Sequence, residues 1–468
     1  MRSRPLEAQD QALKERLSEG ALTSFGRAYG LCEGMRYEEF ARWVPIFDYE
    51  AFKPWVERML AGERDVASKG VVRSFARSSG TTSDRSKYIP VTQRSIRKNH
   101  ARGMQDVAAL YQAANPLSRV MDGRILTLGG SCCREGANLV GDLSAVIYHQ
   151  TLPWNRITCV PGPRIALEAD FDRKCELIAR HCSKLDVRSF AGVPSWNLEL
   201  MRAVLAYNGK SNLKEVWPNL ECFAHGGVSF SPYREAFHRL IPSSDMHYME
   251  TYNASEGFFA IADDLEREDM LLMLDYGTLY EFRQGEQVVP LEGVKVGETY
   301  AIIITSNNGL WRYEIGDTVT FTSVNPYRIR FAGRTRQFLN AFGEEVIVNN
   351  VEQALAEVCP RLGVEVEEYS VAPRFMTLNT PGAHEWAVEF RREPKDLVLF
   401  AREVDEALRR INSDYDAKRR STLDPLVMHP LPKGSFHSWM ILRGKNKVPR
   451  LMQERRVLED LLTLYEKR

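Results

Sequence analysis

Residues 300–305 read YAIIIT, an uninterrupted apolar run in a chain of 468 residues. Such a run is typical of a strand that is buried on both faces of its sheet. Residues 187–191 and 220–224 favour two further strands, and residues 196–207 between them favour a helix. Because strands and helices alternate in this way, the sequence indicates an α/β architecture with parallel strand pairing.

The pattern changes on both sides of this central part. The first 65 residues favour helices, and the residues after Gly333-Arg334 favour an α+β unit. We therefore expect a large N-terminal domain over residues 1–334, built on mixed or parallel sheets with flanking helices, and a small C-terminal α+β domain over residues 335–468. The elements expected in the small domain are a helix over 349–359, strands over 364–371 and 385–390, and a helix over 396–415.

Acidic and basic side chains balance, since Lys plus Arg number 62 and Asp plus Glu number 62. Proteins that bind nucleic acids usually carry a basic excess, so we expect neither a nucleic acid nor a membrane surface as a partner. No run of about 18 apolar residues is present, which excludes a transmembrane helix. The eight cysteines form no C-x-x-C pair, and the N-terminus has no apolar secretory segment. These features favour reduced thiols in the cytoplasm.

Four short segments have the composition of ligand-binding sites. The first, residues 77–87, reads RSSGTTSDRSK. Its small residues allow backbone N–H groups to approach phosphate oxygens, its hydroxyls add donors, and Lys87 supplies a mobile cation. It is not a Walker A loop, because the second Gly and the Gly-Lys pair of that motif are absent. Taken alone, a Ser/Thr/Gly cluster of this kind is more often an ordinary polar turn between strands.

The second segment, residues 252–257, reads YNASEG. Tyr252 has a ring that stacks on a purine, Ser255 has a hydroxyl for a phosphate oxygen, and Glu256 has a carboxylate suited to Mg²⁺. The alternative is a loop in which Ser255 and Glu256 only cap a following helix.

The third segment, residues 311–317, reads WRYEIGD, and Asp317 is placed to accept two ribose hydroxyls. A turn in which Asp317 binds its own backbone is the alternative. The fourth, residues 444–450, reads GKNKVPR and could reach an anionic site from the second domain, although a solvated basic loop is the common case. The histidines form no zinc pattern and no G-x-S-x-G elbow is present, so zinc and triad hydrolases are not favoured.

In this order the four segments resemble the Gretchen Hagen acyl-acid amido synthetases, which belong to the superfamily of acyl-CoA synthetases, peptide synthetase adenylation domains and luciferases. The matching motifs are Ser78-Ser79-Gly80-Thr81-Thr82 with Lys87, Tyr252-Asn253-Ala254-Ser255-Glu256, and Tyr313-Glu314-Ile315-Gly316-Asp317. The third departs from the family pattern because Glu314 replaces an arginine, and the loop before Lys447 is shorter than in bacterial members.

The resemblance implies a large adenylate-forming domain and an ATP-dependent ligase that uses Mg²⁺. The enzyme would convert a carboxylic acid to an acyl-adenylate and pass the acyl group to an amine, in particular an amino acid. Asp317 with Arg334 would hold the ribose, Gly226 and Gly227 would line the adenine pocket, and Glu256 would hold Mg²⁺. Residues 78–82 and Lys87 would cradle phosphates, and Lys447 would enter from the C-terminal domain by rotation about a hinge at Thr335. Two alternatives stay open, an acyl- or aryl-CoA ligase on the same scaffold and a nucleotide-binding scaffold protein without catalysis.

Overall fold

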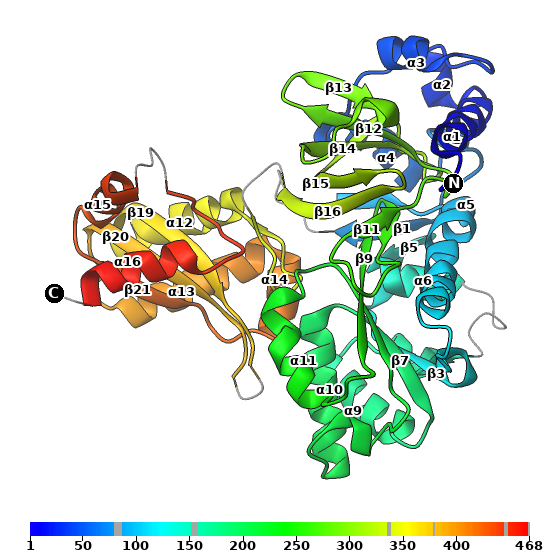
Figure 1. Ribbon diagram of the computed structural model, residues 1–468. Coiled ribbons are helices and arrows are strands. Elements are labelled where there is room, and N and C mark those ends of the chain that lie inside the picture. Colours follow the sequence, from blue (N-terminus) through cyan, green and yellow to red (C-terminus); the bar gives the residue numbers. More distant parts are fainter. Residues whose placement is uncertain (79–86, 151–157, 335–337, 378–379, 444–447, 467–468) are drawn as a thin grey trace.

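The computed structural model describes residues 1–78, 87–150, 158–334, 338–377, 380–443 and 448–466. Figure 1 shows a large unit, coloured blue to green, and a smaller unit, coloured yellow to red, which meet near α14 (Ser413–Arg419). The predicted fold class is confirmed, since a large mixed sheet with flanking helices is joined to a small α+β unit. No helix among the described residues is long and apolar enough to cross a membrane.

Four helices open the chain, as predicted for the first 65 residues. They pack beside one end of the largest sheet (Figure 1), where α1 contacts β12 and α4 contacts β15. All four helices contribute apolar side chains to one buried cluster with the sheet, and those from α2, α3 and α4 include aromatic rings. The helices are α1 (Pro5–Gly20), α2 (Ser24–Ala28), α3 (Tyr37–Trp43) and α4 (Tyr49–Leu60).

The largest sheet has 12 strands in the order β13-β12-β14-β15-β16-β11-β10-β9-β8-β7-β3-β6. Its parallel part runs from β9 to β6, and its other strand pairs are antiparallel. The strands are β3 (Arg124–Thr127), β6 (Cys159–Val160), β7 (Val187–Gly192), β8 (Cys222–His225), β9 (His247–Ala254), β10 (Gly257–Ile261), β11 (Met270–Leu272), β12 (Leu279–Gln284), β13 (Gln287–Pro290), β14 (Thr299–Thr305), β15 (Tyr313–Val324) and β16 (Tyr327–Arg334).

The apolar run at 300–305 forms β14, and every residue of the run is buried. Its expected burial on both faces is therefore confirmed, but the predicted parallel pairing is wrong there, because β14 lies antiparallel between β12 and β15. The parallel prediction holds for β7 and β8. A continuous apolar run indicates that a strand is buried on both faces, but it does not indicate whether the neighbouring strands are parallel or antiparallel. The reason is that helices and a curled sheet can cover a strand equally well.

A second sheet of the large unit has the order β2-β1-β5-β4. The two described ends of the segment 77–87 lie in this sheet, since β1 (Ser74–Ser78) and β2 (Lys87–Pro90) are antiparallel neighbours. Its other strands are β4 (Cys132–Glu135) and β5 (Asn138–Gly141). The helices of this region are α5 (Gln93–Ser95), η1 (Ile96–His100), α6 (Ala101–Ala114), η2 (Val120–Asp122), α7 (Leu143–Gln150), α8 (Pro163–Ala166), α9 (Phe171–Cys182), α10 (Pro194–Asn208), η4 (Leu213–Glu215), η5 (Ser231–Tyr233), α11 (Arg234–Leu240) and η6 (Leu291–Gly293).

The C-terminal unit is built on a sheet of the order β19-β20-β21. The predicted long helix over 396–415 is wrong in one respect, because Asn412 leaves the helical conformation and its side chain accepts from Tyr415 N to cap a new helix. The elements are β17 (Phe338–Leu339), β18 (Val346–Ile347), α12 (Val348–Leu362), β19 (Glu365–Arg374), β20 (Ala383–Arg392), α13 (Leu397–Ile411), α14, β21 (Val427–Leu431), α15 (Ser435–Arg443) and α16 (Arg456–Glu466).

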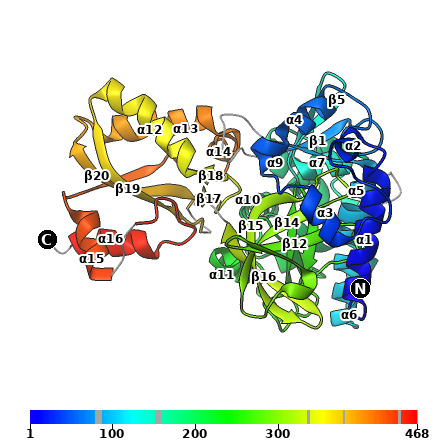
Figure 2. The same cartoon turned by 90° about the horizontal axis from the view of Figure 1, so that it is seen from above.

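The two units share a buried junction, and Figure 2 shows the small unit beside α10 and α11 of the large one. Tyr233 Oη donates to Ala341 O at 2.6 Å, and Ser195 Oγ donates to Phe342 O at 3.2 Å. One apolar cluster runs through both units. These contacts fix where the following α14 lies relative to the large unit.

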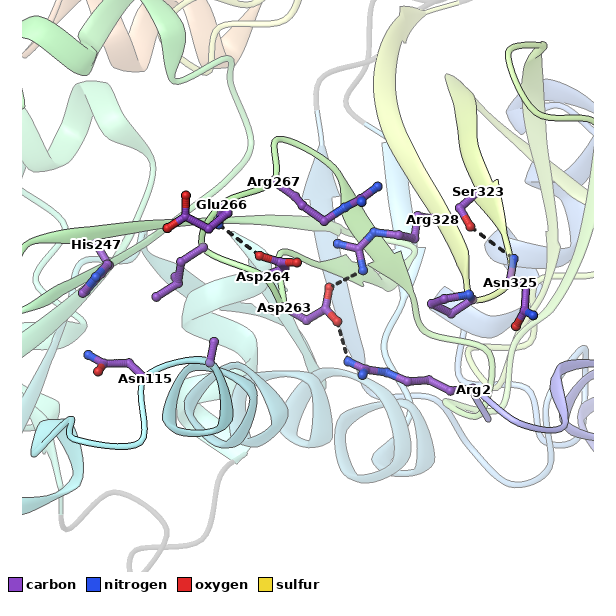
Figure 3. A pocket seen from close by; sticks show the side chains of 13 residues that line it. Arg2, Asn115, His247, Asp263, Asp264, Glu266, Arg267, Ser323, Asn325 and Arg328 are labelled. Atoms are coloured by element: carbon purple, nitrogen blue, oxygen red, sulfur yellow. Dashed lines mark hydrogen bonds and ion pairs between the residues drawn. The ribbon is translucent and has the colours of Figure 1, made fainter.

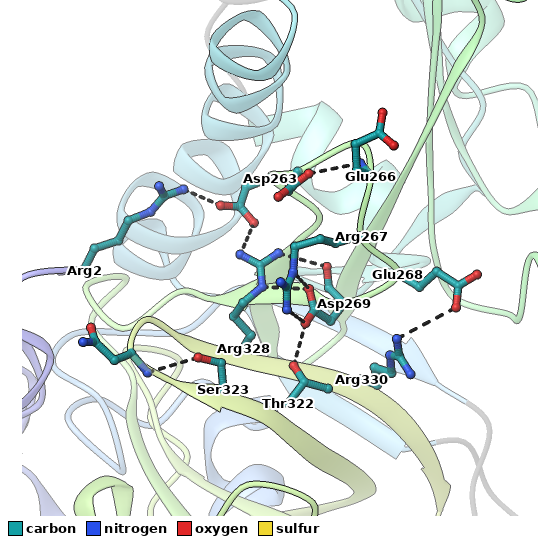
Figure 4. A network of polar contacts seen from close by, with 12 residues as sticks. Arg2, Asp263, Glu266, Arg267, Glu268, Asp269, Thr322, Ser323, Arg328 and Arg330 are labelled. Atoms are coloured by element: carbon teal, nitrogen blue, oxygen red, sulfur yellow. Dashed lines mark hydrogen bonds and ion pairs between the residues drawn. The ribbon is translucent and has the colours of Figure 1, made fainter.

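An ion network ties the N-terminus to two distant strands (Figure 4). Arg328 on β16 is 6% exposed and binds Asp269 Oδ1 through Nε at 2.7 Å and Asp263 Oδ1 through a terminal nitrogen at 2.8 Å. Thr322 donates to Asp269 at 2.7 Å, and Arg2 pairs with Asp263. Figure 3 shows the polar hollow beside this network, where the arginines and aspartates face one another. Because the charges are paired within the protein, the network is structural.

We expect Arg328→Ala to lower the free energy of unfolding by about 3 kcal/mol, because it removes the buried cation that Asp263 and Asp269 share and leaves them only the more exposed guanidinium groups of Arg2 and Arg267. Urea denaturation followed by tryptophan fluorescence measures this change. Arg330→Ala is the matched control, since Arg330 lies on the same strand and makes only an exposed 3.9 Å pair with Glu268. Equal losses in the two variants would show that the network adds no special stability.

Candidate active site

One cavity of 1310 Å³ collects most of the residues that the sequence singled out. It opens between the two sheets of the large unit, with α14 and the segment after β17 of the small unit on one side. The predicted residues that line it are Lys87, Gly226, Gly227, Tyr252, Asn253, Ala254, Ser255, Glu256 and Asp317. Residues separated by more than 200 positions in the chain therefore share one site.

The predicted phosphate loop joins the ends of a hairpin at the cavity. Ser78 on β1 lies opposite Lys87 on β2. Ser79, Gly80, Thr81 and Thr82 lie outside the described residues, so their role stays a prediction. Lys87 lines the cavity and its ammonium lies 5.5 Å from the centre of the Tyr49 ring. The hairpin of β1 and β2 therefore brings the residues on either side of this loop together, and one of them is the cation Lys87.

Gly226 and Gly227 follow β8 at the edge of the parallel strands. A Cβ at Gly226 would lie 2.4 Å from Thr251 O, and Gly227 has a φ of +84°. Only glycine tolerates both constraints without a shift of the backbone. The absence of side chains keeps this wall of the cavity open, which suits a flat base.

Tyr252 and Asp317 meet across the cavity although they lie on different strands. Tyr252 Oη donates to Asp317 Oδ2 at 2.7 Å, and both side chains are buried. Asp317 on β15 is paired in register with Arg334 on β16, whose backbone alone is described here. Phe331, also on β16, lines the cavity and packs edge-on against the Tyr252 ring at 5.7 Å. A carboxylate and two aromatic rings thus converge at one point.

Glu256 lies in the tight turn between β9 and β10, and no helix follows it. Asn308, which is fully buried, donates to Glu256 O at 2.8 Å and fixes the turn. No group of three potential metal ligands is present among the described residues. A single carboxylate still fits Mg²⁺, because this ion is commonly bound by one or two carboxylates together with substrate phosphates and water.

Tyr313 does not line the cavity, so its predicted nucleotide contact finds no support in this geometry. Its side chain is 1% exposed and packs edge-on against Phe52 at 6.0 Å beneath the N-terminal helices. Its neighbours are structural as well: Arg312 binds Glu281 at 2.7 Å, and Glu314 pairs with Arg283. Of this segment, Ile315 and Asp317 line the cavity. Lys447 lies outside the described residues.

Several lining residues were not singled out as site residues from the sequence. Phe331 directly precedes the Ala332-Gly333-Arg334 stretch, so its position in the sequence could have identified it as a site residue. Glu250 lies two residues before Tyr252 on β9, and burial raises the pKa of its carboxyl. Trp196 and Lys418 come from α10 and α14, and no spacing in the sequence relates them.

An apolar arm of the cavity extends between α6 and α7 and the parallel strands. Ala108 and Met104 of α6 face residues of β3 and α7 such as Ile125 and Ile147. Cavities with apolar walls and a few polar groups at one end are typical of small-molecule sites. The polar end carries Asp317, Glu256 and Lys87, so the arm and the polar end together suit an amphiphilic ligand.

Comparison with known proteins agrees with this arrangement. The GH3 family N-terminal domain matches residues 1–138 and 135–246, the central domain matches 270–334 and the C-terminal domain matches 347–456. The chain belongs to the GH3 family. The resemblance that the four segments indicated is therefore confirmed.

Curated relatives and solved structures span nearly the whole chain. Indole-3-acetic acid-amido synthetase GH3.4 of Arabidopsis thaliana is 22% identical over 95% of this chain and 89% of its own length. 4-Substituted benzoates-glutamate ligase GH3.12 of the same organism is 22% identical over 97% and 94%. The AtGH3.15 acyl acid amido synthetase has a TM-score of 0.63 at 18% identity over 98% and 94%. A 2-hydroxyisobutyryl-CoA ligase has a TM-score of 0.61 at 14% identity over 99% and 92%.

We expect Asp317→Ala to raise the KM for ATP by about 10- to 100-fold, because a carboxylate that accepts two hydroxyls contributes charge-assisted hydrogen bonds. Tyr252→Phe keeps the ring and removes only the hydroxyl that orients Asp317, so its KM for ATP should rise by about two- to tenfold. Steady-state kinetics with varied ATP measures both.

Tyr280→Phe is the control for Tyr252→Phe. Tyr280 is a buried tyrosine of the same apolar cluster that donates to Met273 O at 3.1 Å, away from the cavity. Its loss should change thermal stability and leave the KM for ATP unaltered. Unchanged ATP kinetics in Asp317→Ala would remove that residue from the ribose site.

Proposed function

We propose that this GH3 protein is an ATP-dependent acyl-acid amido synthetase. It adenylates a carboxylic acid and transfers the acyl group to an amine, in particular an amino acid. The observation that carries the proposal is the convergence of Lys87, Tyr252, Glu256 and Asp317 on one cavity that also has an apolar arm. The GH3 relatives named above, an indole-acetate amido synthetase and a benzoate-glutamate ligase, perform reactions of this class.

In the first step the substrate carboxylate attacks the α-phosphorus of ATP, which forms the acyl-adenylate and releases pyrophosphate. Asp317 and Tyr252 hold the nucleoside, and the bare backbone of Gly226 and Gly227 accommodates the base. Lys87 and the loop that follows β1 hold the departing phosphates. Groups that are fixed before the reaction stabilise this charge without reorganisation, which is the main source of catalysis in phosphoryl chemistry.

Glu256 is the residue that would hold Mg²⁺, which when bound neutralises phosphate charge. The hydrogen bond from Asn308 to the backbone of Glu256 keeps that turn in place when ligands exchange. Lys447 is assigned to the α-phosphate by the family motif, and the boundary near Thr335 to the hinge. Both assignments, like the cytoplasmic location, remain proposals.

In the second step an amine attacks the acyl carbon, the bond from that carbon to the phosphate oxygen breaks, and AMP leaves. A thiol such as that of coenzyme A would complete the same step as a thioester. The named CoA ligase shares the fold at 14% identity, which carries no argument about the acceptor. The acceptor therefore has to be identified by an assay that offers the protein both amines and coenzyme A.

We expect ATP–pyrophosphate exchange that depends on a carboxylic acid, measured with indolic, aromatic and aliphatic acids in separate pools and without amine. Addition of the twenty standard amino acids or of coenzyme A to the active pool, followed by mass spectrometry, identifies the acceptor. A thioester without amide would replace the proposal by a CoA ligase. ATP binding without exchange in any pool would favour a scaffold that has lost catalysis.

The apolar arm leads us to expect hydrophobic acids, and Ala108→Phe tests this by filling the arm from α6. Exchange with long or aromatic acids should fall by about tenfold or more relative to short acids, because the added ring occupies their space. Ala109→Phe is the matched control, since Ala109 is the next residue of the same helix, is exposed and does not line the cavity. Equal loss for short and long acids would place the acid elsewhere.

A further inference from the structure

Lys174 is a buried cation that the reaction described above does not use. It lies on α9 and is 2% exposed, and its ammonium donates to Gly129 O at 2.7 Å and to Gly130 O at 2.9 Å. Both glycines line the cavity, whereas Lys174 itself does not. Any effect of Lys174 on a ligand therefore passes through the loop to which the two glycines belong.

This loop, residues 128–131, is held from two sides. The N–H of Gly130 donates to Ser144 Oγ at 3.0 Å, and the N–H of Ser131 donates to Asp142 Oδ2 at 2.8 Å. Each of these two peptide groups is thus bonded through its carbonyl to the ammonium on α9 and through its N–H to a side chain at the start of α7. A peptide group that lies between an ammonium and a carboxylate is polarised, which strengthens both of its hydrogen bonds.

The two glycines allow the loop to lie directly on the start of α7. A Cβ at Gly129 would lie 2.8 Å from Ser144 Oγ, and a Cβ at Gly130 would lie 1.9 Å from Asp142 Oδ2. The loop therefore lies in contact with α7 on one side and with the ammonium of Lys174 on the other. A shift in either direction would break hydrogen bonds to one of these two partners.

The loop lies at the acid side of the cavity and away from the proposed nucleoside site. It follows β3, and the strand order β9-β8-β7-β3 places β3 about 14 Å from β9, the strand that carries Tyr252. Ile125 of the same β3 belongs to the apolar arm. Ligands of parallel sheets bind outside the carboxyl ends of the strands, and the loop lies at that end of β3. It thus borders the cavity at the end of the arm.

We propose that Lys174 is a positioning residue for adenylation, because it holds the loop 128–131 as the wall against which the reacting carboxylate of the acid is placed. Lys174 acts on the acid only through this loop. The assignment rests on the proposed function, since it concerns the first step of that reaction. A wall that shifts by a fraction of an ångström misaligns the carboxylate with the α-phosphorus and lowers the rate steeply.

Lys174→Met tests the hold on the loop in the full-length protein without any ligand. The amide hydrogens of Gly130 and Ser131 should exchange with deuterium about 10- to 100-fold faster, because the variant lacks both bonds from the charged ammonium to the loop. Mass spectrometry of the peptide that contains the loop measures this rate against that of the β3 amides. Arg328→Ala is the stability control, since it destabilises the large unit outside the cavity and should leave this ratio unaltered.

The same variant separates the acid from the nucleotide. The kcat/KM for the best acid in ATP–pyrophosphate exchange should fall by about 10- to 100-fold. The Kd for ATP, measured by calorimetry without acid, should change by less than about twofold. Lys184→Met is the matched control, because Lys184 follows α9 directly, is exposed and does not line the cavity. If Lys174→Met does not fold, Gly129→Ala displaces the loop through its contact with Ser144 and should give the same split.

Three outcomes distinguish the assignment from its alternatives. Unchanged deuterium exchange in the loop, or the same kinetic loss in Arg328→Ala, would show that Lys174 contributes only stability. A loss of ATP affinity as large as the loss of kcat/KM for the acid would place the loop at the nucleotide and overturn the assignment. A wild-type protein without exchange in any acid overturns the proposed function, whereas the deuterium experiment still reports whether Lys174 holds the loop.

Discussion

The hydrogen bond between Tyr252 and Asp317 is possible only because the largest sheet curls. Between β9 and β15 lie β10, β11 and β16, so the two strands are four spacings apart. In a flat sheet that distance would be about 19 Å, yet the two side-chain oxygens are 2.7 Å apart. The sheet must therefore fold back on itself between these strands. The resulting hollow holds the candidate active site, and the ion network around Arg328 and Asp269 links β16 to the loop before β11 on the same bend.

The local elements were predictable because each depends on neighbours in the chain. Apolar continuity identified β14, and strand–turn–helix order identified β7, α10 and β8. The pairing partners of β14 were not predictable, since the run reports burial only. The break at Asn412 was missed because an amphipathic pattern continues through it, and only its capping bond to Tyr415 shows that the helix restarts.

The site was predictable to the extent that its chemistry lies in contiguous motifs. Glu256 and Asp317 were named from such motifs and both line the cavity. Tyr313 was grouped with Asp317 because both belong to one motif of the family that the sequence resembles. The four positions between them correspond to about 13 Å of strand, which is enough to carry β15 from the apolar core under α4 to the cavity. Lys418 and Trp196 belong to different units and meet only in three dimensions.

The cavity separates the charges that the two half-reactions require. Adenylation concentrates negative charge on phosphates, and Lys87 with the hairpin of β1 and β2 lies where cations are needed. The carboxylates near Lys418 come from both units, with Asp414 and Glu345 on the small unit and Asp142 on the large one. Carboxylates directly beside the phosphates would repel them, at a cost of several kcal/mol in a site of low dielectric constant. Because these three line the cavity at the junction of the two units, their field depends on how the small unit sits against α10.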